Sequence, residues 1–337
     1  MLEILLGLAV FLAKAVIIVA AIIIVAVFIT SLALKGKLSE QSFKLTNLSK
    51  KLKKTASELR KELNKDMASE KEAKRLLKAE QKAEKKLKSS KPEKERKLFV
   101  LDFNGDVKAS SAEALRQCVT QVITLADAEK DEVLIRLESP GGMVSGYGLA
   151  ASELSRLRNA NLELTVAVDK VAASGGYLMS CVASKIIAAP FAVVGSIGVV
   201  AGMPNFNKLL KKNDIDYDVL TAGKYKRTLT MFGENTPEGK EKFVDQLEQI
   251  HALFKRFVNQ YRPSLDMEKV GTGEYWFGED AMNLGLVDAI KTSEDYLLEL
   301  NKTHEIFHLE YEEKKKLIER LMQSASAAVH KSPIDFI

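Results

Sequence analysis

Short apolar segments alternate with helical segments between residues 98 and 290, and this alternation leaves few folds open. Residues 98–103 (LFVLDF) and 132–138 (EVLIRLE) have the length and apolar content of strands, and residues 111–126 between them are amphipathic with a helical period. Strands separated by helices are typical of parallel βαβ units with right-handed crossovers. The pattern predicts an α/β domain, and residues 98–290 are numerous enough to bury one core.

The same alternation continues to residue 290. We expect further helices at residues 146–158, from Ser174 onward and at 237–261, and further strands at 162–168, 186–189, 217–220 and 285–290. The remainder, residues 291–337, is interpreted as a C-terminal helical extension, with its helix at residues 311–328.

The chain begins with a long apolar stretch. Residues 15–34 contain no charged residue, and twenty helical residues span about 30 Å, the thickness of the bilayer core. The run is too long for the core of a cleaved signal peptide and lacks a small-x-small cleavage site before Lys35, so residues 1–34 are predicted to be an uncleaved transmembrane anchor. A second uncharged run, residues 186–203, contains Pro190 and three glycines, which favours buried strands and turns over a second span.

Residues 35–97 form a basic connector with 22 Lys and Arg residues against ten Asp and Glu. Helix-forming residues dominate it, and apolar positions from Leu45 to Met67 recur at steps of three and four. Such a narrow stripe indicates a helix that a partner covers, one that lies against anionic lipid headgroups, or a solvated spacer. Nucleic-acid binding is disfavoured because the segment lacks interleaved aromatic residues.

Composition excludes several classes of site. The 337 residues include two cysteines and four histidines, too few for a disulfide framework or a cysteine-rich zinc site, and the histidines lack a zincin pattern. These counts disfavour metal centres of these kinds.

Two glycine-bearing turns are the candidates for chemistry. Residues 139–142 (SPGG) follow a predicted strand, and residues 172–177 (AASGGY) lie where another strand meets a helix. Each is either an ordinary tight turn or a set of backbone N–H groups aimed at an anion. Ser174, at the start of a helix, is either an N-cap or an exposed nucleophile, with the Gly175 N–H directed at an oxyanion.

A nucleophilic serine needs a base. His251 lies inside the predicted helix 237–261, so a Ser–His–Asp triad has weak support. The lysines of residues 222–227 (AGKYKR) are the better candidates, and a lysine acts as a base only when its pKa is lowered from about 10.4. Lys224 and Lys226 both remain open on this reasoning.

Four motifs together resemble the signal peptide peptidase A (SppA) family of serine peptidases. They are SPGG at 139–142, AASGGY at 172–177, GSIGV at 195–199 and AGKYK at 222–226. The anchor, the basic connector and the single protease domain (98–290) look most like the SohB branch. The resemblance implies a ClpP/crotonase-like fold with Ser174 as nucleophile, Lys226 as general base, Gly141 and Gly175 as oxyanion donors, and Ser196 as a hydrogen-bond partner of the lysine.

The resemblance also implies a function and its partners. We expect a serine endopeptidase in the bacterial inner membrane that cleaves apolar peptides, such as signal-peptide remnants or damaged membrane and exported proteins. It is expected to form a homo-oligomer in which neighbouring copies complete each site, and the resemblance implies no metal or organic cofactor. No nucleic acid is expected as a partner, because the basic connector lacks interleaved aromatic residues. The basic flank favours a cytoplasmic domain and the resemblance an external one. A silent membrane scaffold and an acyl-CoA enzyme of the crotonase type are the alternatives.

Overall fold

A seven-stranded sheet forms the centre of the protein. The computed structural model describes residues 7, 11, 14–25, 42–65 and 95–312. The strand order is β1-β10-β2-β3-β4-β6-β9, and every neighbouring pair from β10 to β9 is parallel. Its strands are β1 (Ser42–Asn47), β2 (Arg96–Asn104), β3 (Glu132–Glu138), β4 (Glu163–Val168), β6 (Lys185–Ala188), β9 (Ala289–Ile290) and β10 (His304–Glu312).

A smaller sheet of three strands adjoins the large one. Its order is β5-β7-β8, with β5 parallel and β8 antiparallel to β7. A single bridge between Ser139 and Ala172 links the end of β3 to β5, so the two sheets meet where the candidate turns lie. The strands are β5 (Val171–Ala173), β7 (Val193–Gly195) and β8 (Tyr275–Phe277).

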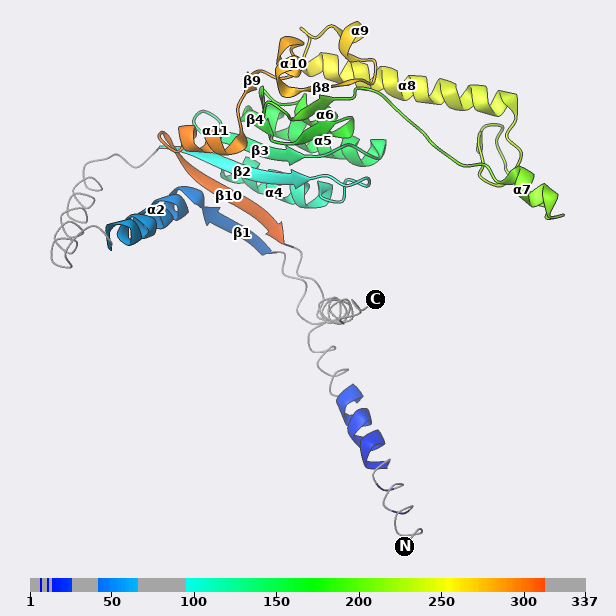
Figure 1. The fold of residues 1–337 in the computed structure, drawn as a ribbon, viewed down its shortest axis with the longest axis horizontal. Helices are drawn as coiled ribbons and strands as arrows, with labels where there is room; N and C mark the ends of the chain where they lie inside the picture. The colour runs from blue at the N-terminus through cyan, green and yellow to red at the C-terminus, as the bar shows by residue number, and fades with distance from the viewer. Residues whose placement is uncertain (1–6, 8–10, 12–13, 26–41, 66–94, 313–337) are drawn as a thin grey trace. The chain divides into compact units, whose positions relative to one another are not determined.

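Helices cover both faces of the large sheet (Figure 1). Those of the described residues are α2 (Leu48–Lys65), α4 (Ala112–Leu125), α5 (Val144–Asn159), α6 (Gly175–Ser180), α7 (Asn207–Lys212), α8 (Pro237–Tyr261), α9 (Met267–Val270), α10 (Gly278–Asn283) and α11 (Ser293–Leu300), together with helical residues 14–25.

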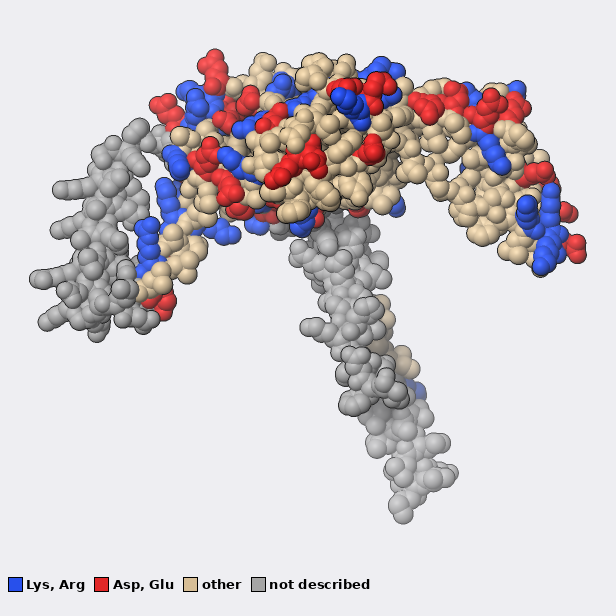
Figure 2. All heavy atoms as spheres, turned by 45° about the horizontal axis from the view of Figure 1, so that its top comes forward, with Lys and Arg blue, Asp and Glu red and all other residues tan. Residues whose placement is uncertain are grey.

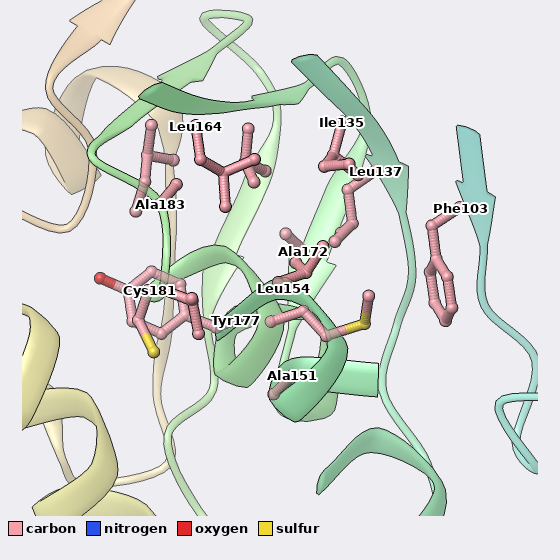
Figure 3. Close-up of a cluster of buried hydrophobic side chains, with 14 of the residues drawn as sticks. Phe103, Ile135, Leu137, Ala151, Leu154, Leu164, Ala172, Tyr177, Cys181 and Ala183 are labelled. Carbon is pink, nitrogen blue, oxygen red and sulfur yellow. The ribbon is translucent and has the colours of Figure 1, made fainter. Parts of the chain in front are cut away.

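Strand β2 shows why the sheet has a core on each side. Its side chains alternate between faces. Phe99, Leu101 and Phe103 join the larger buried cluster with α4, α5, α6 and α8, part of which is drawn in Figure 3. Leu98 and Val100 join a second cluster under α11. A parallel sheet covered on both faces needs such continuous apolar strands.

Most of the predicted elements of residues 98–290 are confirmed. The helix predicted at 237–261 is α8, which begins at Pro237 after the Thr236 side chain accepts a hydrogen bond from the Gly239 N–H. The second uncharged run, 186–203, contributes the buried strands β6 and β7, as expected for core structure.

Three expectations were wrong. Residues 42–47, placed in the helical connector, form strand β1 beside β10. Residues 304–312, placed in the helical extension, form β10, which pairs with β2 because Ile306 and Leu309 are buried there. Residues 217–220 form no strand, since all four side chains are exposed and no strand pairs with them.

Parts of other expectations lie outside the described residues. These are most of the anchor at 1–34, the connector between 66 and 94, and the end of the C-terminal extension. Within the described ranges, no helix has the length and apolar character needed to cross a bilayer.

Candidate active site

Ser174 lies at a sharp turn between β5 and α6. Its backbone has φ 51° and ψ −117°, a combination that glycine favours and side chains resist. The Ser174 N–H donates to the Gly195 carbonyl at 2.8 Å, which holds the turn against the end of β7. Strained strand-to-helix turns of this kind present a nucleophilic serine in other enzymes. Ser174 is therefore not a relaxed helix cap, and its side chain makes no capping hydrogen bond.

The SPGG turn packs directly against this serine. Gly141 has φ +90°, and a Cβ added there would lie 2.7 Å from the Ser174 Cβ and 2.8 Å from the Gly175 nitrogen. Both the backbone conformation and the lack of space require glycine at residue 141. The Ala173 N–H donates to the Ser139 carbonyl at 3.0 Å, which fixes the two turns to each other.

A chain of buried and partly buried hydrogen bonds supports the SPGG turn. The Tyr147 hydroxyl donates to the Asp106 carbonyl at 2.8 Å, so the Ser139 hydroxyl, 2.6 Å from the Tyr147 oxygen, donates to Tyr147. Ser139 Oγ in turn accepts the Gly141 N–H at 3.1 Å. Burial raises the pKa of Tyr147, which keeps its hydroxyl protonated and able to donate. No sequence pattern indicated Tyr147, while Ser139 was visible only as the first residue of the motif.

The backbone N–H groups near Ser174 differ in whether they already donate a hydrogen bond within the chain. Gly175 is the first residue of α6, where N–H groups have no partner within the helix and the dipole is positive. A Cβ on Gly175 would lie 2.3 Å from the Tyr147 ring, so that residue too must be glycine. Gly141 already donates to Ser139 Oγ. No acceptor for the Gly142 N–H lies among the described residues.

Ser196 lies beside the site, in the loop that follows β7. It has φ 54°, its N–H donates to the Glu274 carbonyl at 2.6 Å, and the preceding residue accepts from Ser174. The next carbonyl, that of Ile197, contacts His251 Nε2 of α8 at 3.1 Å. Because a carbonyl only accepts, Nε2 carries the proton in this contact. His251 thus steadies the loop behind Ser174, a role that the sequence did not indicate.

Lys226 lies on a projecting arm, defined here as residues 198–236, which Figure 1 shows extending away from the two sheets with α7 at its end. Only one residue of the arm is buried. The loop of the arm that contains Lys224 and Lys226 contacts the start of α8, where Lys224 Nζ lies 2.8 Å from Glu238 Oε1. Thirteen helical residues, about 20 Å, separate Glu238 from His251, whereas a base must approach its nucleophile to about 3 Å. Within one chain the structure brings Ser174, Gly141, Gly175 and Ser196 together, and leaves Lys226 apart.

In the described ranges no three His, Cys, Asp or Glu side chains are grouped to hold an ion. Cys118 and Cys181 are buried and unpaired, and burial raises the pKa of both thiols.

Comparison with known proteins shows the family of this chain. Residues 3–154 match the model of the peptidase family S49 N-terminal region, and residues 156–306 match that of peptidase family S49. The chain belongs to peptidase family S49. A "Probable protease SohB" of Haemophilus influenzae is 56% identical over 233 residues, which are 69% of this chain and 66% of the relative. One of Buchnera aphidicola from Acyrthosiphon pisum is 52% identical over 71% of this chain and 70% of the relative.

The chain matches about two thirds of the length of these bacterial relatives. Among solved structures, a lysine-to-alanine mutant of the "1510-N membrane-bound stomatin-specific protease", in complex with a substrate peptide, has a TM-score of 0.41 and 12% identity. The match covers 69% of this chain and 98% of that one.

Proposed function

We propose that this family S49 member is a membrane-anchored serine endopeptidase of ClpP/crotonase-like fold, with Ser174 as its nucleophile. The observation that carries the proposal is the strained Ser174 backbone, held between the start of α6 and the SPGG turn. Strain of about 1–3 kcal/mol at one residue persists only where the surrounding structure imposes it, and such residues cluster at active sites.

Lys226 is proposed as the general base in preference to Lys224. The hydrogen bond and charge of Glu238 raise the pKa of Lys224, helped by the Tyr225 hydroxyl, and this keeps Lys224 protonated. A protonated lysine cannot accept the serine proton. No carboxylate pairs with Lys226 among the described residues, and its exposed side chain is accessible to a neighbouring copy.

The distance between Ser174 and Lys226 in one chain supports a homo-oligomer with composite sites. The exposed arm carries apolar side chains such as Val200 and Leu220, which are more than nine-tenths exposed. Exposed apolar surface of this kind marks an interaction site. We propose that the arm of one copy covers the site of a neighbour, so that the neighbour's Ser174 receives this copy's Lys226 and Ser196 orients that lysine.

The chemistry then follows from these residues. Lys226 Nζ takes the Ser174 proton as Oγ attacks the peptide carbonyl carbon, and the same proton passes to the leaving amine as the C–N bond breaks. Water then hydrolyses the acyl-enzyme by the same relay. Gly175 N–H stabilises the oxyanion, and removing one such donor costs about 2.7–4 kcal/mol of barrier. Gly141 was the expected second donor; since its N–H is engaged by Ser139, Gly142 becomes the better candidate.

The proposed substrates are apolar peptides, including signal-peptide remnants and damaged membrane or exported proteins, and the proposed location is the bacterial inner membrane. Support comes from the apolar arm and from the uncharged run at residues 15–34, which is long enough to span a bilayer. The membrane face of the catalytic domain stays open.

Cleavage of an apolar fluorogenic peptide by the full chain in detergent tests the proposal. Wild type is expected to cleave it, Ser174→Ala and Lys226→Ala to lose activity while still assembling, and Lys224→Ala to retain it as the matched control. Full activity in Lys226→Ala would refute the dyad. Inactive wild type that also fails to react with a fluorophosphonate would favour the silent scaffold.

A further inference from the structure

Among the described residues, hydrogen bonds join the first turn of helix α2 to the body. Asn47 Oδ1 accepts the Lys50 N–H at 2.8 Å, which caps the helix. Ser49 Oγ donates to Asn301 at 2.7 Å and accepts the Ile306 N–H at 3.0 Å. These bonds set the direction of the helix, whereas residues 50–60 are all exposed.

The exposed length of α2 has two chemically different faces. Leu52, Leu59 and Leu63 are 40%, 61% and 71% exposed, and their spacing of seven and four places them on one side of the helix. Ser57, two residues before Leu59, lies on the opposite side. Basic residues outnumber acidic ones, and blue side chains predominate over this helix in Figure 2. The exposed charged residues are Lys50, Lys51, Lys53, Lys54, Glu58, Arg60 and Glu62.

We propose that α2 lies along an anionic lipid bilayer, with its leucine face at the boundary between the headgroups and the acyl chains. A basic helix with an uncovered apolar stripe fits a surface that is both negatively charged and apolar below the charge. The charge-free run ends at residue 34, and the fourteen residue steps to Leu48, where α2 begins, span at most about 50 Å. The proposed anchor would therefore keep the start of α2 within about 50 Å of the bilayer. The inference rests on that anchor and not on the Ser–Lys dyad.

The test uses the full chain in liposomes with a fluorophore on one introduced thiol. Cys118 and Cys181 are only 5% and 0% exposed, so labelling of the folded protein is confined to the new position. Leu59→Cys places an environment-sensitive nitrobenzoxadiazole label on the leucine face, and Ser57→Cys is the matched control on the polar face. Liposomes contain phosphatidylcholine with or without phosphatidylglycerol, and lipids brominated on the acyl chain quench fluorophores that enter the bilayer.

The proposal predicts strong quenching at Leu59→Cys, at least threefold greater than at Ser57→Cys, and a clear decrease without phosphatidylglycerol or at high salt. Equal, weak quenching at both positions would overturn it. A blue-shifted Leu59→Cys label that bromine does not quench would also overturn it, and would assign the face to residues 66–94 or to a second copy. Flotation of the same liposomes checks the anchor, and peptide cleavage checks the proposed activity, so the three failures are distinguishable.

Discussion

Replacing Ser174 by glycine should make the protein more stable as it destroys the proposed nucleophile. At φ 51° and ψ −117° the Ser174 Cβ is crowded by the backbone, whereas glycine adopts this conformation freely. Ser174→Ala is the matched variant because it removes the same hydroxyl and keeps the strained Cβ. Both variants should be inactive, and only Ser174→Gly should gain stability.

The size of the gain follows from two opposing effects. Holding a residue with a side chain in this region costs about 1–3 kcal/mol. Glycine loses more backbone freedom on folding, which offsets about 0.5–1 kcal/mol. We therefore expect Ser174→Gly to exceed Ser174→Ala by about 1 kcal/mol in free energy of unfolding. That difference would raise the midpoint of thermal unfolding by about 2–4 °C for a domain of this size.

The assay is thermal unfolding of both variants in the same detergent, followed by circular dichroism. Asn161→Gly is the control, because Asn161 has φ 58° but asparagine tolerates this region, so its gain should be near zero. A Ser174→Gly midpoint equal to or below that of Ser174→Ala would refute the claim that strain is stored at the serine.

Three further outcomes are expected from the same geometry. Gly175→Ala should lose about 1–3 kcal/mol of stability and most of the activity, because the new methyl group would meet the Tyr147 ring. The control is Gly148→Ala, which has open space around the new methyl group and should be at least as stable as wild type in urea unfolding. Tyr147→Phe and Tyr177→Phe each remove hydroxyl hydrogen bonds and should each cost about 1–3 kcal/mol of stability. Only Tyr147→Phe should lower kcat for peptide cleavage, because the Tyr147 hydroxyl contacts Ser139 of the SPGG turn. Equal kcat values for the two variants would contradict a supporting role of Tyr147. Burial opposes ionisation of Asp102, but hydrogen bonds from His308 and Arg136 outweigh it and lower the pKa of Asp102 from 3.8 to about 2. The contribution of this carboxylate to the free energy of unfolding is therefore present above pH 3.8 and is lost as the pH falls toward 2. Since that carboxylate is over a third exposed, the contribution is discounted to about 1 kcal/mol, and Asp102→Asn should flatten the acid limb of the stability curve by that amount.

Local sequence patterns predicted the helices and strands whose bounds depend on neighbouring residues. Strand β3 and helix α8 have the predicted bounds because an apolar strand pattern, a threonine cap and an N-terminal proline are all read from neighbouring residues. Strands β1 and β10 were missed because their pairing joins residues more than 250 positions apart. Residues 217–220 have strand-like composition, but no sheet edge lies beside them.

The candidate site also contains parts that the sequence predicted and parts that it did not. Ser174 and the glycine turns are short motifs, and the structure brings them together. The hydrogen-bond chain from Gly141 through Ser139 to Tyr147 was hidden, because it depends on how α5 packs beneath the SPGG turn. The separation of Lys226 from Ser174 was equally hidden within one chain, since it depends on the direction of the arm and of α8.

Mixing two inactive variants tests the composite Ser–Lys site most directly. Ser174→Ala supplies an intact Lys226, and Lys226→Ala supplies an intact Ser174, so equal amounts reassembled from dissociated subunits should recover about one quarter of wild-type peptidase activity, whatever the number of subunits. Each variant reassembled alone is the control and should stay inactive. A mixture that forms hetero-oligomers and yet cleaves no peptide would contradict a site shared between copies.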